Sequence, residues 1–183
     1  IDTWRSDALG ASGSGRVKTP NLDAFANGGL YCPKAWSSAT LTAPSHATLL
    51  TGLQPYHHGV RDNHGFRLSS SVPTLASLLR EKGYATAAFV SAHPLARIMG
   101  LDNGFTVYDD RCAPGDLLSV VPRWRPGSET IEVARSWLRT APDRFFLWVH
   151  LYEPHDPYAP PEPYRTTYRD APYFGEVAYT DEL

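Results

Sequence analysis

A threonine hydroxyl stands at the start of an apolar helical segment in the stretch "LTAPSHATLLTG", Leu41 to Gly52. Pro44 lies in the first turn, so Thr42 falls where helix N–H groups and the positive end of the helix dipole can hold an oxyanion such as phosphate or sulfate. A threonine hydroxyl is a poor nucleophile and needs a metal or a base to activate it. The simpler alternative is that Thr42 is only the N-cap of this helix.

An aspartate and several histidines are further candidates for chemistry. Asp2 ends what looks like an apolar strand, and its carboxylate could bind a divalent cation, although a solvated or capping aspartate is the commoner case. The seven histidines favour a phosphate or metal site, although any single histidine is more often structural. Six of them crowd one segment or follow predicted strands: His57, His58, His64, His93, His150 and His155.

Composition limits the class of protein. The chain has 183 residues, 42% of them hydrophobic, which suits one globular domain with a core. A net charge of -2 gives no basic excess for nucleic acid or an anionic membrane. The two cysteines lack the spacing of a zinc site, and no run approaches the roughly 18 apolar residues of a membrane span.

Alternating strand and helix patterns predict an α/β fold. Proline near the start and glycine at the end indicate helices in "TPNLDAFANGG", with Thr19 as N-cap, and in Pro73 to Lys82. Another helix with a cap-like Ser128 is predicted over Glu129 to Arg139. "YATAAFVSA" and the aromatic run Phe145 to Tyr152 read as buried strands, the second in the interior of a parallel-rich sheet between two of these helices.

Two proline-rich segments are predicted to be loops. Arg111 to Arg125 reads as a surface excursion, and "EPHDPYAPPEPY" directly follows the strongest strand. Ligands of open α/β sheets bind beyond the carboxyl ends of the strands, so His155 lies where chemistry is expected.

Four stretches together resemble the N-terminal part of a sulfatase-family enzyme of the alkaline phosphatase superfamily: "IDTWRSDALG", "TPNLDAFANGGLYCPKAW", "TAPSHATLLTGLQPYHHGV" and "HLYEPHDPYAPPEPY". The ending "YFGEVAYTDEL" resembles the helix that precedes the family's second metal-ligand strand. The resemblance covers almost the whole chain. It implies a three-layer α/β/α sandwich of the alkaline phosphatase type, incomplete here, with a mostly parallel mixed sheet.

The resemblance also implies roles for individual residues. Asp2 matches the first metal aspartate, and Thr42 matches the nucleophile that shares the metal. Thr3 stands where many sulfatases have a second aspartate. His93 and His155 match histidines that contact the ester or its leaving group.

Other positions depart from the family pattern. His46 replaces an arginine that supports the nucleophile, and we count it with the catalytic residues. Ser91 falls where a sulfate-binding lysine is common, and we assign Ser91 and Asn63 to substrate binding. Thr42 is neither cysteine nor serine, so it cannot become formylglycine. Threonine nucleophiles recur among the superfamily's phosphodiesterases, phosphonate hydrolases and phosphoglycerol or phosphoethanolamine transferases.

We therefore expect a metal-dependent hydrolase or transferase of phosphate or sulfate esters, with Ca, Mn, Mg or Zn as cofactor and no formylglycine. The substrate is expected to be a small anionic ester, on a glycan or a lipid, and not a nucleic acid. Residues 1–183 are expected to be the N-terminal portion of the catalytic domain, truncated at both ends and inactive alone because later metal ligands are missing. An inactive member that binds an anion and a formylglycine-independent sulfatase are the alternatives. Cellular location and membrane association stay open.

Overall fold

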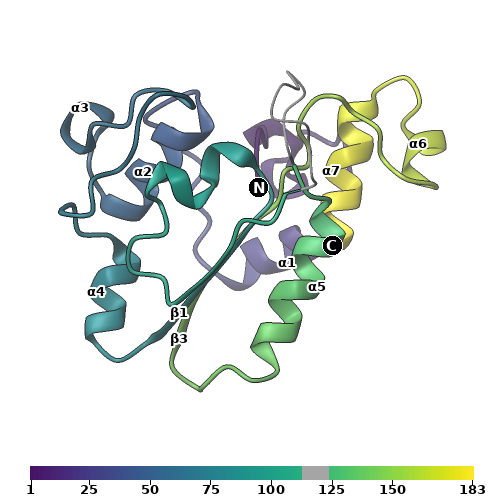
Figure 1. The fold of residues 1–183 in the computed structure, drawn as a ribbon. Coiled ribbons are helices and arrows are strands. Elements are labelled where there is room, and N and C mark those ends of the chain that lie inside the picture. The colour runs from purple at the N-terminus through teal and green to yellow at the C-terminus, as the bar shows by residue number, and fades with distance from the viewer. Residues whose placement is uncertain (113–123) are drawn as a thin grey trace. The chain divides into compact units, whose positions relative to one another are not determined.

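The computed structural model describes residues 1–112 and 124–183 (Figure 1). The chain divides into two compact units, which are considered separately. Unit 1 joins Ile1–Trp36 to Leu151–Leu183, and unit 2 is Ser37–His150. In the described residues, no helix has the length and apolar character needed to cross a membrane.

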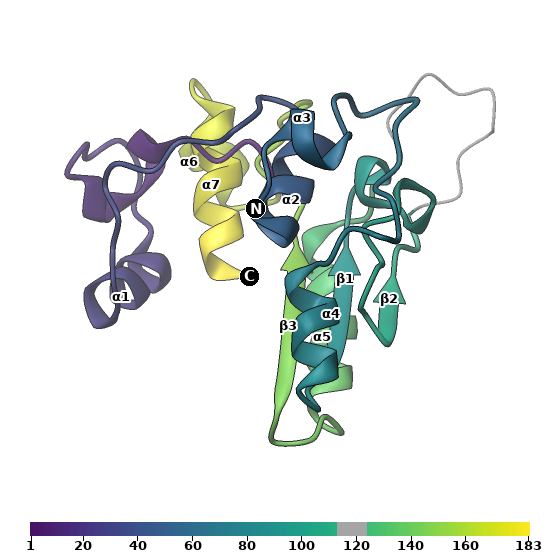
Figure 2. The ribbon, with the colours of Figure 1, turned by 90° about the vertical axis from the view of Figure 1, so that its left-hand side faces the viewer.

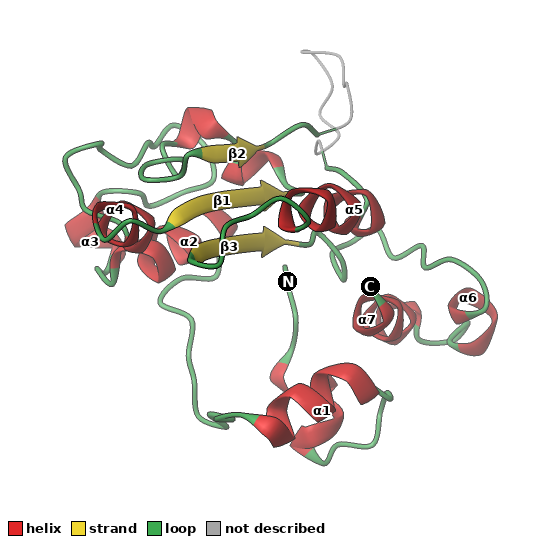
Figure 3. Cartoon of the chain, turned by 90° about the horizontal axis from the view of Figure 1, so that it is seen from below, coloured by secondary structure: helices red, strands yellow, loops and turns green. Residues whose placement is uncertain are grey.

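Unit 2 contains a parallel sheet of three strands, β1 (Ala85–Val90), β2 (Val107–Asp109) and β3 (Phe145–His150). The strand order is β2-β1-β3, as Figure 3 shows. The expected strand at "YATAAFVSA" is confirmed as β1. The expected interior place for the aromatic strand is wrong for the described sheet. β1, in which Ala87 and Ala88 are fully buried, takes the centre, and β3 pairs only with β1 within the described chain.

Helices cover both faces of this sheet, so the α/β class and the three-layer arrangement are confirmed (Figure 2). Side chains of a strand alternate between the faces. Ala88 and Val90 point to the layer of α2 (Thr42–Thr51) and α4 (Leu75–Glu81). Ala87 and Phe89 pack instead with Ala134 of α5 (Gly127–Leu138).

The expected helices of these layers form, with shifted ends. α4 begins after Thr74, which exchanges hydrogen bonds with Ser77 in a capping box. α5 begins at Gly127, before the expected cap Ser128, because the Thr130 N–H already donates to the Pro126 carbonyl (3.1 Å). The sequence patterns therefore predict the helices, and local hydrogen bonds set their first residues.

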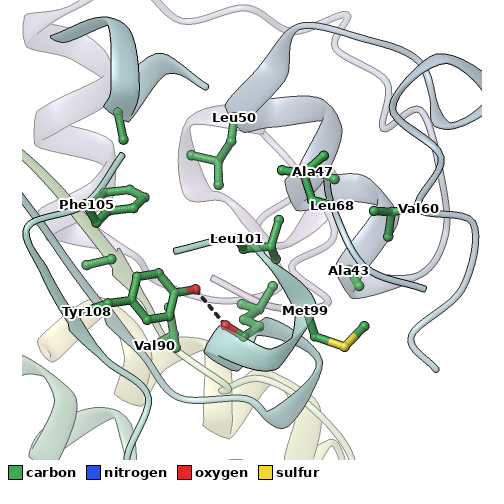
Figure 4. Packing of buried hydrophobic residues seen from close by; sticks show 13 residues of the cluster. Ala43, Ala47, Leu50, Val60, Leu68, Val90, Met99, Leu101, Phe105 and Tyr108 are labelled. Atoms are coloured by element: carbon green, nitrogen blue, oxygen red, sulfur yellow. Dashed lines mark hydrogen bonds between the residues drawn. The ribbon is translucent and has the colours of Figure 1, made fainter. Parts of the chain in front are cut away.

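The largest core of unit 2 lies between α2, α4 and the sheet, and Figure 4 shows its packing. Leu95 and Met99 come from two short 3-10 helices, η3 (His93–Leu95) and η4 (Arg97–Met99). The Tyr108 hydroxyl donates to the Leu95 carbonyl (2.6 Å), and burial raises the pKa of Tyr108. This bond ties β2 to the segment that follows β1. A further short helix, α3 (Pro55–His58), follows α2.

Unit 1 consists of helices around a small core. It contains the 3-10 helices η1 (Ser6–Ala8) and η2 (Gly10–Ser12), then α1 (Pro20–Gly28), α6 (Tyr164–Thr167) and α7 (Pro172–Glu182). Thr19 is the N-cap residue of α1, as expected, but the first N–H groups of the helix donate to the Asp181 carboxylate of α7. The proline-dense stretch after β3 is the predicted loop.

The predicted excursion from Arg111 to Arg125 is only partly described, because residues 113–123 lie outside the described ranges. Its last residue contradicts the prediction. Arg125 is 5% exposed and donates its backbone N–H to the Ser91 carbonyl (2.8 Å), next to the end of β1.

Candidate active site

Thr42 is the first residue of α2, and Leu41 takes the N-cap position. The alternative that Thr42 is an N-cap is therefore wrong. The Ala43 N–H donates to Asn63 Oδ1 (2.8 Å), and the Ser45 N–H donates to the Leu41 carbonyl (3.1 Å). Pro44 has no N–H. The backbone of these three residues therefore offers no N–H group to an anion. The helix end would attract an anion through its dipole instead.

His46 lies one turn beyond Thr42 and contacts its backbone. His46 Nδ1 is 2.8 Å from the Thr42 carbonyl oxygen. A carbonyl only accepts, so Nδ1 carries the hydrogen. The ring also packs against Trp148 and His150, with centroids 5.7 and 4.9 Å away. His46 thereby holds the first turn of α2 against β3.

The segment after β1 carries two predicted site residues with different surroundings. His93 is half-buried and begins η3. Ser91 is fully buried, and its hydroxyl donates to the His150 carbonyl (2.5 Å) and lies 2.9 Å from Thr130 Oγ1. In this position the Ser91 hydroxyl contributes to the fold, and its assignment to substrate binding gains no support.

His155 belongs to unit 1 and has a fixed ring orientation. Its ring stacks on Tyr152 at 4.4 Å, and its Nδ1 lies 2.7 Å from the Asp156 carbonyl oxygen. Nδ1 therefore carries the hydrogen, which leaves Nε2 to exchange a proton with a substrate. Burial, with the nearby charges of Asp2 and Asp156, raises the pKa of Tyr152 to about 12. Tyr152 is thus a neutral platform for the ring.

Asp2 lies beside the start of the same loop. It is buried, its N–H donates to the Leu151 carbonyl (2.9 Å), and its Oδ1 accepts from the Thr3 N–H (2.9 Å). Thr3 has a φ of 47°, which is rare for a β-branched residue, and its hydroxyl donates to the Pro154 carbonyl (2.8 Å). Thr3 therefore fastens the loop that carries His155.

The predicted site residues thus form two groups, one within each unit. Thr42, His46 and Asn63 gather at the start of α2, and His93 begins η3, which packs against α2. Asp2 and His155 share one region of unit 1. Convergence of the two groups on one cleft stays a prediction.

The described residues do not by themselves fit a divalent metal ion. Such an ion takes six or more oxygen ligands or a tetrahedral set of nitrogen and sulfur ligands. The resemblance assigns two oxygen donors, Asp2 and Thr42, and the Thr3 hydroxyl already donates to a carbonyl. In residues 1–112 and 124–183, no three His, Cys, Asp or Glu side chains are grouped so that they could hold a metal.

Sequence reasoning missed a buried ion pair beyond the strand ends. Arg125 Nη1 lies 2.9 Å from Asp109 Oδ1, and both side chains are buried. The signal for Asp109 was its place at the end of a short strand. Arg125 gave no signal, because its proline-rich surroundings indicated an exposed loop.

The sulfatase family profile matches residues 1–183, the whole chain. The chain belongs to the sulfatase family. Its sulfatase relatives include human N-sulphoglucosamine sulphohydrolase, 32% identical over 152 residues, covering 80% of this chain and 29% of the relative. N-acetylglucosamine-6-O-sulfatase of Bacteroides thetaiotaomicron is 27% identical, covering 72% of this chain and 23% of the relative.

Solved structures share the sulfatase fold at lower identity. Phosphonate monoester hydrolase of Agrobacterium radiobacter superposes with a TM-score of 0.78 at 20% identity, over 100% of this chain and 56% of that one. BT4656, solved with D-glucosamine-2-N,6-O-disulfate, gives 0.73 at 21% identity, over 90% and 35%. These likenesses concern the fold. The chain spans less than a third of the length of these curated relatives.

Proposed function

We propose that the protein is an ester hydrolase or transferase of the sulfatase family in which Thr42 is the nucleophile. The observation that carries this proposal is the place of Thr42, the first residue of α2 and not its cap, in a chain that the family matches throughout. The helix dipole at this end favours the negative charge that a sulfate or phosphate group brings.

The reaction runs in two displacement steps. Thr42 Oγ forms a bond to sulfur or phosphorus while the bond to the leaving alcohol oxygen breaks; a base takes the Thr42 proton, and the leaving oxygen receives a proton. Water or an acceptor alcohol then attacks the threonine ester and returns a proton to Oγ. His93 and His155 are the proposed proton donors to the leaving oxygen, with Nε2 as the reacting atom of His155, since its Nδ1 already donates to Asp156.

Asn63 and His46 are proposed to support this centre. Asn63 Oδ1 accepts from Ala43, so the amide NH₂ of Asn63 can donate to a bound anion in place of that helix N–H. His46 holds the Thr42 backbone through its carbonyl.

The sulfatase family generally uses a divalent metal ion. We propose Asp2 and Thr42 as the contribution of residues 1–183 to such a site, with the remaining ligands supplied from outside these residues. Because the described residues do not complete the site, no step of the mechanism is assigned to the ion. Its identity among Ca, Mn, Mg and Zn is left to measurement.

The proposed substrate is a sulfate or phosphate ester on a sugar or a lipid. Two relatives are named for sulfated glucosamine derivatives, which favours a sugar-borne ester. Thr42 favours phosphorus over sulfur. Formylglycine releases sulfate by collapse of a hemiacetal, which a threonine ester cannot do, whereas a second in-line attack is usual for phosphoryl enzymes.

A substrate panel on the complete gene product tests this proposal. Aryl sulfates, phosphate monoesters, phosphate diesters and phosphonate monoesters are assayed with each of the four metals. We expect phosphodiester turnover to exceed aryl sulfate turnover. The reverse order would refute the preference for phosphorus, and tight anion binding without turnover of any ester would favour the inactive, anion-binding alternative.

A further inference from the structure

A buried polar cluster lies at the carboxyl ends of β1, β2 and β3, and its members come from four parts of unit 2. They are Ser91, Asp109, Arg125 and Thr130, all at most 9% exposed. None of them belongs to the proposed catalytic set of Thr42, His46, His93 and His155.

The Arg125 guanidinium uses each of its three nitrogens. Nη1 donates to Asp109 Oδ1 (2.9 Å), Nη2 to the Val90 carbonyl (3.2 Å) and Nε to Thr130 Oγ1 (2.9 Å). One side chain thus joins the last residues of β1 and β2 to the first turn of α5. Lysine has no planar fork that could make these three bonds together.

The hydrogen bonds continue from Thr130 to the end of β3. Ser91 donates its single hydroxyl proton to the His150 carbonyl, so the proton in the 2.9 Å contact between the two hydroxyls comes from Thr130 Oγ1. The Pro126 carbonyl is a second, more distant acceptor for the Thr130 hydroxyl (3.3 Å). The order is Arg125 Nε–H, Thr130 O–H, Ser91 O–H and the His150 carbonyl. Chains of hydrogen bonds that point one way reinforce each other in a buried setting.

The backbone is held at the same place. The Arg125 N–H donates to the Ser91 carbonyl (2.8 Å), and Ala92 forms an antiparallel bridge with Trp124. Residues 90–92 are therefore fixed from both sides, and His93 is the next residue.

Because both charged side chains are buried, stability alone does not explain this ion pair. Replacing a buried ion pair by apolar side chains of similar volume is often neutral or stabilising. Opposing effects act on Asp109: burial raises its pKa, while Arg111 and Arg125 outweigh it and lower the pKa to about 2. The pair is thus charged at neutral pH, and it ties the last residue of β2 to the Arg125 side chain, which also binds the last residue of β1.

We propose that Arg125 is a positioning residue that sets the place of His93 by holding residues 90–92. This inference rests on the proposed role of His93 as a proton donor to the leaving group. It also gives Ser91 a place in the site, as a link in the support and not as a contact of the substrate.

The test is a double-mutant cycle in the complete gene product, with rates normalised to folded protein. R125K keeps the charge but loses the fork, and we expect kcat to fall about 10- to 100-fold with KM within about 3-fold, the effect of a small misplacement of a catalytic group. In the H93A background R125K should cost nothing more. An undiminished loss from R125K in that background overturns the inference.

If R125K folds poorly, two further comparisons test the inference: T130V against T130S, and R111K against the wild type. T130V removes the hydroxyl that links Arg125 to Ser91, whereas T130S keeps it, so T130V should lower kcat and T130S should retain it. R111K alters the exposed arginine that also pairs with Asp109 but hydrogen-bonds to no strand carbonyl within the described ranges, and it should leave kcat unchanged. Equal losses in T130V and T130S overturn the inference. Wild-type activity of the single variant H93A would refute the proposed function of His93. This result is distinct from a failure of the Arg125 inference, which the double-mutant cycle measures.

Discussion

Thr42 is the residue on which the proposed chemistry depends. T42A should lower kcat by on the order of 10³ or more, the scale seen when a covalent nucleophile is removed. T42S should retain measurable turnover, because the hydroxyl and the helix start are kept. Steady-state kinetics of both variants are the measurement, with mass spectrometry of quenched wild-type enzyme to detect the ester on Thr42.

The formylglycine route gives the control for this prediction. T42C, produced together with a formylglycine-generating enzyme, should not raise phosphodiester hydrolysis above that of T42S. Full activity of T42A would show that Thr42 is not the nucleophile.

Asn63 offers a second test at the level of one side chain, because its oxygen and its nitrogen are given different roles. N63D keeps an acceptor for the Ala43 N–H, and its negative charge suits a helix N-terminus, so the free energy of unfolding should change little. The same change removes the NH₂ donor and repels an anion. We expect KM for an anionic ester to rise about 10-fold or more.

N63A separates the two roles of Asn63. It should lower the free energy of unfolding by about 1 kcal/mol, as loss of a helix cap does, and should raise KM less than N63D. A KM for N63D equal to that of the wild type would remove Asn63 from the anion site.

At the scale of elements, the Asp109–Arg125 pair joins β2 to the segment before α5 and predicts a pH dependence of stability. The pKa of Asp109 is lowered to about 2, so its contribution is fully present above the ordinary carboxyl pKa near 4 and is lost as the pH falls through about 2. D109N should lower the free energy of unfolding by about 3 kcal/mol at pH 7, because it leaves Arg125 buried without its countercharge.

Urea unfolding of the wild type and D109N at pH 7, 4 and 2 measures this effect. The gap between the two proteins should persist at pH 4 and shrink towards pH 2. A gap that is the same at all three pH values would mean that the charge of Asp109 does not contribute.

Particular elements show how far the sequence determines the fold. The proline and glycine that bracket α4 and the apolar run of β1 are strong local signals, and both elements form where these signals predict them. β3 has an equally strong pattern, but hydrophobicity does not distinguish a central strand from an edge strand. Strands of both kinds bury or half-bury many of their side chains. The order β2-β1-β3 follows from contacts between distant segments.

The candidate site also has parts that the sequence predicted and parts that it did not. A proline in the first turn indicated the helix that begins at Thr42, and the resemblance to the sulfatase family supplied the roles of His93 and His155. The partners of these residues were not predictable, since Asn63 reaches Ala43 across 20 positions and Ser91 reaches His150 across 59. Such pairings depend on how the sheet is assembled and not on local sequence.

At the scale of the whole molecule, the proposed site draws residues from both units. We predict that Asp2, Thr42, His93 and His155 converge on one cleft. A crystal structure of the complete gene product with a bound oxyanion is the measurement. We expect the Thr42 hydroxyl and the Asp2 carboxylate to lie no more than about 10 Å apart, because residues farther apart cannot share one metal ion with bonds of about 2 to 2.6 Å. A larger separation would refute the joint assignment.

Unit 1 is discontinuous, since Ile1–Trp36 packs with Leu151–Leu183, and this has a consequence during synthesis on the ribosome. Between these two segments the ribosome makes all of Ser37–His150, which at about 5 to 20 residues per second takes on the order of ten seconds. During that time the Asp2 N–H lacks the Leu151 carbonyl, and α1 lacks the Asp181 carboxylate that receives its first N–H groups. During this interval residues 1–36 lack their partners in unit 1, and Phe25, Leu30 and Trp36, which are more than 80% exposed even in the folded unit, offer apolar surface to a chaperone.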